Sequence, residues 1–168
     1  MASFSESAPY QFGLVGEKEI VKILQSHGAY VIPQYNYAEE DDSKGPRMHG
    51  QDSELILPDL DVCKSKIRIW VEVKTKSDMN KHKKTGDYVH GFNKKHYEHY
   101  LKVENESGNE VWVVFIERMS GKHLCGRLKK IPIHHVYTGD KMGRSGMVFF
   151  NVTDLNPLSF LFNRMGVL

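Results

Sequence analysis

Residues 57–77, LPDLDVCKSKIRIWVEVKTKS, carry the pattern that decides the fold of this chain. They predict a β-hairpin whose arms are residues 59–63 and 67–75, joined by a tight turn. Apolar and polar residues alternate strictly along the second arm, so one set of side chains points to each face. The side chains of Glu72 and Lys74 are therefore expected side by side on one face of the hairpin.

The first arm brings further carboxylates, because the same alternation places Asp59 and Asp61 on one of its faces. If this is the face that carries Glu72, two or three carboxylates and the Lys74 ammonium group meet across the paired strands. Carboxylates packed this closely repel one another, and a hard cation such as Mg²⁺ relieves the repulsion because it prefers oxygen ligands. A lysine beside such an ion can hold a water or stabilise charge on a phosphate. The pattern therefore predicts a site for metal-assisted phosphodiester hydrolysis.

Pro58-Asp59, twelve intervening residues and then Glu72-Val73-Lys74 resemble the motif of the PD-(D/E)XK nuclease superfamily. The resemblance implies an α/β fold with a restriction-endonuclease-like αβββαβ core. Such a core has a mixed central sheet flanked by helices, here with C-terminal strand and helix additions. It also implies that Asp59, Glu72 and the Val73 carbonyl bind Mg²⁺, for which Mn²⁺ can substitute, and that Lys74 is catalytic. The alternative interpretation is an ordinary exposed hairpin with charged residues on its solvated face.

A helix is expected over residues 11–26, and it carries one acidic residue in an unusual place. Apolar residues follow Glu17 at spacings of three, four and seven: Ile20, Val21 and Leu24. Glu17 therefore lies on the core-facing stripe, where an unpaired carboxylate is unfavourable unless a site such as a metal centre supplies a partner. In several branches of the superfamily a first-helix glutamate completes the metal site, and Glu17 resembles it, whereas Glu19 falls off the stripe. The alternative is a helix-edge glutamate paired with Lys18, Lys22 or water.

Nucleic-acid contacts are expected in two places. A basic segment leaves the second hairpin arm directly, and its candidate phosphate contacts are Lys76, Lys81, Lys83 and Lys84. A second helix is expected over residues 93–104, where His96 and Tyr100 share a face. The RecB-like branch of the superfamily carries Gln-x-x-x-Tyr on this helix, and here His96 stands where the glutamine would be. The alternative for the lysines is a solubilising loop.

The remaining elements are expected to complete an α/β sheet. A long polar connection, residues 35–53, offers Arg47 and His49 as further phosphate contacts, or is a solvated loop. The expected strands are 29–34, 54–63, 110–117, 124–131 and 147–152, and the last expected helix is 157–163. The strand at 110–117 is apolar on both sides, which is typical of a central strand covered on both faces.

Composition sets outer limits on the function. Residues 1–168 are expected to form a single domain, and a net charge of +2 requires any nucleic-acid surface to be local. The two cysteines form no spaced set, and no segment has the form of a signal peptide or approaches the ~20 apolar residues of a membrane span. A cytoplasmic protein without membrane contact is therefore expected.

The sequence therefore predicts a metal-dependent DNA endonuclease. A homodimer is one arrangement by which such an enzyme could make paired cuts. Two other functions stay open. One is a nuclease-like module that binds nucleic acid or a protein without cutting, and the other is a structural domain with a coincidental motif.

Overall fold

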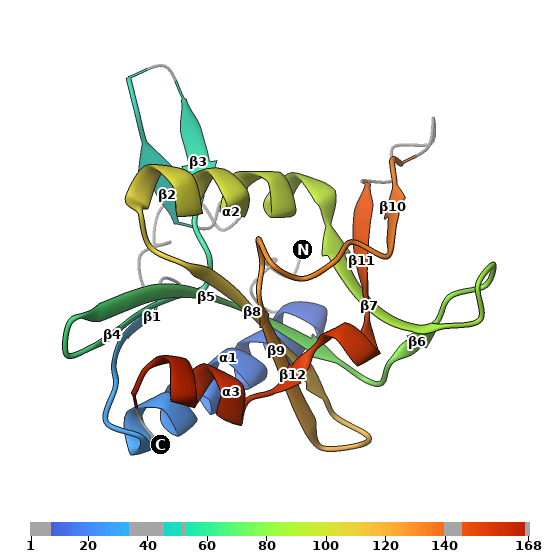
Figure 1. The fold of residues 1–168 in the computed structure, drawn as a ribbon, viewed down its shortest axis with the longest axis horizontal. Coiled ribbons are helices and arrows are strands. Elements are labelled where there is room, and N and C mark those ends of the chain that lie inside the picture. Colours follow the sequence, from blue (N-terminus) through green and yellow to red (C-terminus); the bar gives the residue numbers. More distant parts are fainter. Residues whose placement is uncertain (1–7, 34–45, 52, 140–145, 167–168) are drawn as a thin grey trace.

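The structure of the protein is a computed structural model that describes residues 8–33, 46–51, 53–139 and 146–166 (Figure 1). The first part of the expected long connection, residues 35–45, lies outside the described residues. No helix in the described part of the chain is both long enough and apolar enough to cross a lipid bilayer.

A six-stranded mixed sheet forms the centre of the molecule, in the spatial order β1-β4-β5-β8-β9-β12. Its strands are β1 (Tyr30–Pro33), β4 (Leu60–Lys64), β5 (Ile67–Lys76), β8 (Val111–Glu117), β9 (Lys122–Arg127) and β12 (Asn156–Pro157). β5 and β8 are parallel, and the other neighbouring pairs are antiparallel. The expected hairpin is confirmed as β4 and β5, and the expected central strand is confirmed as β8, in which every residue is buried.

Helices cover both faces of this sheet (Figure 1). α1 (Ala8–Ser26) and α3 (Ser159–Arg164) pack on one face, where Ile20, Leu24 and Leu161 contact Val71 and Val73 of β5 in one apolar cluster. α2 (Lys94–Ser107) packs on the other face, in a second cluster that contains Trp70, Tyr100 and Val103. The order α1, β1, β4, β5, α2, β8 is the αβββαβ core that the sequence predicts.

The ends of α2 follow from its local sequence. Asn93 caps the helix, because its side chain accepts a hydrogen bond of 2.8 Å from the backbone N–H of Lys95. The helix ends at Gly108, whose φ of 68° lies in the left-handed region that glycine adopts without strain. The expected N-cap is thus confirmed, and it sets where α2 begins.

A second sheet, of order β10-β11-β7-β6, was not expected from the sequence. Its strands are β6 (Asn80–Lys81), β7 (Tyr88–Asn93), β10 (His135–Tyr137) and β11 (Met147–Asn151). The expected last strand is present as β11, but it pairs with β7 and β10 rather than with the central sheet. We call residues 80–93, which form the β6–β7 hairpin, the basic arm; it projects from the body of the molecule (Figure 1).

The expected strand over residues 54–63 is wrong in one respect. It is broken into β3 (Glu54–Ile56) and β4, with residues 57–59 between them. Pro58 has no N–H group to donate to a ladder, so it separates the two strands. β3 instead pairs with β2 (Arg47–His49), which shows that the end of the expected connection is a strand rather than a loop.

Candidate metal centre

Two hydrogen bonds hold Asp59 beside β5, one to Glu72 and one from Val73. The backbone N–H of Asp59 donates to Oε2 of Glu72 at 3.3 Å, and the backbone N–H of Val73 donates to Oδ2 of Asp59 at 2.8 Å. β4 begins at Leu60, opposite Val71, so β5 extends beyond its antiparallel partner at this point. The Asp59 carboxylate takes the place of the missing strand, and this fixes it beside the Glu72 carboxylate.

Lys74 lies on the same face of β5 as Glu72, as the alternation predicts, and the two side chains form an ion pair. Glu72 is 1% exposed, and its Oε1 atom, which faces the Lys74 ammonium group, forms no hydrogen bond of ordinary geometry. A buried carboxylate oxygen without a hydrogen bond is unfavourable. This oxygen therefore depends on a cation for its stabilisation, and the Lys74 ammonium group supplies that charge in the described structure.

The acidic groups of the site raise one another's pKa values. Burial and then the neighbouring Glu72 carboxylate raise the pKa of Asp59 well above its ordinary range. Burial and Glu72 also raise the pKa of Glu17, to about 7. Burial lowers the pKa of Lys74, but Glu72 and Asp59 outweigh it and the net change is upward. Three acidic groups thus share one ammonium group, and their full ionisation is unfavourable without a further cation.

Glu17 comes to this site because α1 approaches β5 very closely. A Cβ atom placed on Gly16 would lie 1.9 Å from Oγ1 of Thr75, so only glycine permits this contact. The next residue, Glu17, is then close enough for its pKa to respond to Glu72 and Lys74. This role of Gly16 was not predicted from the sequence, although a glycine inside a helix directly before a candidate ligand was a usable signal.

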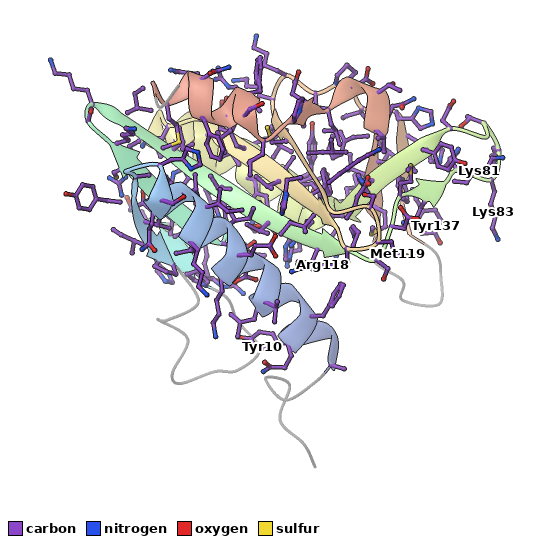
Figure 2. The ribbon with its side chains drawn as sticks, turned by 90° about the horizontal axis from the view of Figure 1, so that it is seen from below. Tyr10, Lys81, Lys83, Arg118, Met119 and Tyr137 are labelled. Atoms are coloured by element: carbon purple, nitrogen blue, oxygen red, sulfur yellow. The ribbon has the colours of Figure 1, made fainter. Side chains whose placement is uncertain are left out.

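Glu19 is held elsewhere, as its position off the helix stripe predicts. It accepts hydrogen bonds from Arg118 at 2.5 Å and from His123 at 2.6 Å. Arg118 stands at the end of β8 next to α1 (Figure 2). Despite partial burial, these two partners lower the pKa of Glu19, opposite to the shift at Glu17. The two glutamates of one helix therefore have different environments.

Asp61, the other candidate ligand, does not join the centre. Both of its oxygens are bound by Arg68, with Nε–Oδ1 at 2.9 Å and Nη2–Oδ2 at 2.6 Å. Arg68 in turn lies over the Trp70 ring, 5.8 Å from its centroid. The alternation placed Asp61 on a polar face correctly, but the arginine of the opposite strand neutralises it.

His96 and Tyr100 lie on the face of α2 that turns toward the carboxylates. Tyr100 is 2% exposed, and its hydroxyl is 3.4 Å from Nδ1 of His96. Burial, followed by Glu72 and Asp59, raises the pKa of Tyr100 well above its ordinary value. Burial lowers the pKa of His96, although Glu72 opposes this change. Both side chains are thus within electrostatic reach of the centre.

The candidate phosphate contacts fall into separate places. Lys76 ends β5, where burial and the neighbouring Lys74 lower its pKa. The other three lysines are exposed on the basic arm: Lys81, Lys83 and Lys84. Figure 2 shows Lys81 and Lys83 at the outer end of that arm. Arg47 forms an ion pair with Glu54 at 2.6 Å, and the nearest contact of His49 to the same residue is 3.8 Å.

The donor set of the centre fits a hard divalent cation. Among the residues that the structure describes, no three carboxylate, imidazole or thiol groups converge as placed to hold one ion by themselves. An ion bound here would therefore have two carboxylates, Asp59 and Glu72, supplemented by backbone oxygen and water. This mixed oxygen shell is the kind that Mg²⁺ accepts.

Comparison with known proteins gives a match in structure only. No family model matches the sequence, and no curated protein matches it. The solved structure of Hjc, a Holliday junction resolvase from the archaeal hyperthermophile Archaeoglobus fulgidus, is similar with a TM-score of 0.56 at 10% identity. The match covers 90% of this chain and 95% of Hjc. A second similar structure, D212, a nuclease from a fusselovirus, has a TM-score of 0.45 at 15% identity and covers 94% of this chain and 90% of D212.

The likeness to Hjc confirms the fold that the sequence resemblance implies. This chain therefore has the restriction-endonuclease-like core, with a mixed sheet flanked by helices.

Proposed function

We propose that this protein is a metal-dependent endonuclease that hydrolyses phosphodiester bonds in DNA. The observation that carries the proposal is a pair of hydrogen bonds, from the Asp59 N–H to Glu72 and from the Val73 N–H to Asp59, which holds the Asp59 carboxylate next to Glu72 and Lys74. The fold shared with Hjc, a Holliday junction resolvase, supports it.

Asp59 and Glu72 are the proposed ligands of Mg²⁺ or Mn²⁺, with Val73 as a third. In an extended strand the N–H and C=O of one residue point to the same side. The N–H of Val73 is bonded to Asp59, so its carbonyl oxygen is directed to the same edge of β5. Glu17 completes the shell from α1, directly or through a water. When bound, the cation would stabilise negative charge on the phosphate and on the leaving oxygen.

Lys74 is the proposed catalytic lysine. Its ammonium group is held at the carboxylates by the ion pair with Glu72. From there it can donate a hydrogen bond that orients the attacking water, and it can stabilise the charge that develops on the phosphate. Tyr100 and His96 limit the site on the side of α2, where they are proposed to contact the substrate.

Charge also decides how the substrate is held. The three acidic side chains at the centre repel a phosphate backbone unless a dication is present. Lys76 and the lysines of the basic arm supply the positive charge that attracts it. The nucleic acid is therefore proposed to cross the metal centre and extend along the arm. A homodimer is proposed as the arrangement that would allow two strands to be cut.

A cleavage panel tests the proposal. The purified protein is incubated with supercoiled plasmid, linear duplex, single strands, a four-way junction and RNA, with Mg²⁺, Mn²⁺ or EDTA. A four-way junction belongs in the panel because Hjc is a Holliday junction resolvase. We expect cleavage of a DNA substrate only with a divalent ion, and absence of cleavage in every arm would contradict the proposal.

Lys74→Ala and Lys66→Ala form the matched pair for this panel. Lys66 is an exposed lysine in the turn of the same hairpin. We expect Lys74→Ala to abolish cleavage while DNA binding persists, and Lys66→Ala to cleave like the wild type. Wild-type cleavage rates in Lys74→Ala would exclude the role given to that side chain. DNA binding without cleavage in the wild type would favour the non-cleaving module instead.

A further inference from the structure

Three histidines from distant parts of the sequence gather beside the loop of the basic arm. The ring of His82, in the β6–β7 loop, lies 5.3 Å from the ring of His134 and 4.9 Å from the ring of His135. The rings of His82 and His135 lie near the ring of Phe149 in β11, at 6.2 Å and 6.4 Å, and the backbone N–H of His134 donates to the Phe149 carbonyl at 2.9 Å. We call His82, His134 and His135 the histidine cluster. None of these residues belongs to either apolar core cluster of the described chain.

A threonine hydroxyl links two members of the cluster. Oγ1 of Thr85 lies 3.1 Å from Nδ1 of His82 and 3.2 Å from Nε2 of His134. Asp87 lies 3.6 Å from the same Nε2 atom. One hydroxyl carries one proton, so it can donate to one imidazole and accept from the other. The arrangement therefore suits a partly protonated cluster, in which neighbouring imidazoles share hydrogen bonds without all being charged.

The charged groups around the cluster are unbalanced. Lys84 and Asp87 face His82 from the arm, His135 faces it from β10, and His134 faces it from the residue directly before β10. Across from them, β11 contributes the uncharged Phe149. Burial and the two neighbouring imidazoles lower the pKa of His82, and Asp87 opposes this only in part. One carboxylate thus faces three imidazoles. When these imidazoles are protonated, that carboxylate alone does not neutralise them, so a further anion can bind beside them favourably.

The position of the cluster indicates which anion this is. The exposed lysines of the basic arm stand on the loop that carries His82: Lys81, Lys83 and Lys84. A row of ammonium groups along a projecting hairpin is suited to a repeating phosphate backbone rather than to one small anion. Imidazoles beside these lysines add charge when they take up protons near neutral pH.

We infer that the histidine cluster and the lysines of the basic arm form one phosphate-binding surface, and that nucleic acid binds there with uptake of protons by the cluster. The inference rests on the proposed function for the identity of the partner. It adds that the affinity for nucleic acid rises as pH falls through the range of imidazole titration. By linkage, each proton taken up on binding contributes about a tenfold change in affinity per pH unit.

The test measures binding of a fluorescent DNA duplex by anisotropy, in EDTA, between about pH 5.5 and pH 7.5, where imidazole titrates. The wild type is compared with a combined His82→Gln, His134→Gln and His135→Gln variant. We expect the affinity of the wild type to rise toward low pH and the combined variant to lose most of that slope. Glu17 and Asp59 also titrate, but they are unchanged in both proteins, so the difference between the slopes isolates the cluster.

The Lys83→Gln and Lys84→Gln double variant is the matched control on the same loop. We expect it to bind more weakly at every pH while it keeps the wild-type slope. An unchanged slope in the histidine variant would overturn the inference and leave the nuclease proposal intact. Absence of DNA binding by the wild type at every pH would overturn both.

A second measurement does not depend on how well the histidine variant folds. Calorimetric titration of the wild-type protein with the same duplex, in two buffers of different ionisation enthalpy, gives the number of protons taken up. We expect net uptake at about pH 6.5, close to the ordinary pKa of imidazole. A count of zero would contradict the inference directly.

Discussion

Replacing Glu17 by glutamine should make the protein more stable, although it removes a proposed site residue. The pKa of this carboxyl is about 7 in the folded protein, against 4.5 for an unperturbed group. A raised pKa of an acid means that the folded state binds the proton more tightly than the unfolded chain does. The folded state therefore loses stability relative to the unfolded chain as pH rises from 4.5 through 7.

The size of the effect follows from the same shift. At about pH 8 the ionised carboxyl costs the folded state about 3 kcal/mol, and at about pH 5 less than about 1 kcal/mol. Glutamine has nearly the same shape and no charge. We therefore expect Glu17→Gln to raise the free energy of unfolding by about 2–3 kcal/mol at the higher pH, and by little at the lower pH.

Urea unfolding in EDTA at the two pH values measures this difference. Glu19→Gln is the matched control, because Glu19 lies two residues further along α1 and its pKa is lowered by Arg118 and His123. Its ion pairs stabilise the folded state above the ordinary pKa of the carboxyl and are lost as pH falls, so this variant should be less stable at the higher pH. Equal stability of Glu17→Gln and wild type at both pH values would refute the reasoning and favour a solvated helix-edge glutamate.

Two further substitutions probe how the site is held. In urea unfolding, Gly16→Ala should destabilise the protein by about 1–3 kcal/mol, because its new Cβ atom would collide with Thr75. Gly13→Ala is the control, because its Cβ atom would lie 4.0 Å from its nearest neighbour. We expect Gly13→Ala to stabilise α1 by about 0.5–1 kcal/mol. Asp61→Asn should lower stability by about 1–3 kcal/mol through loss of the Arg68 ion pair, yet cleavage should continue at the wild-type rate. Loss of cleavage in a folded Asp61→Asn protein would return that residue to the list of ligands.

The sequence predicts the hairpin well because its signals are local. The alternation along β5 fixes the faces of Glu72 and Lys74, and Asn93 caps α2 through its own side chain. The partner of Asp61 was not predictable in the same way. Alternation gives the face of a side chain but not which cation on the opposite strand will reach it, and here Arg68 binds both oxygens.

The second sheet was missed because its strands carry weak signals. β6 has two residues, and β7 contains Gly91, which weakens a strand pattern. The structure gives that glycine a packing reason, since a Cβ atom there would lie 2.6 Å from the Phe149 ring. The phenylalanine belongs to β11, far along the chain, so no local pattern reports the contact. The histidine cluster depends on the same long-range pairing and was hidden for the same reason.

The most direct test of the central claim is calorimetric binding of Mn²⁺ to the wild type and to Asp59→Asn, Glu72→Gln and Asp61→Asn. If Asp59 and Glu72 hold one ion together, the wild type and Asp61→Asn bind one Mn²⁺ per chain. Each of the other two variants should then lose at least about tenfold in affinity. Wild-type Mn²⁺ affinity in both Asp59→Asn and Glu72→Gln would contradict the account.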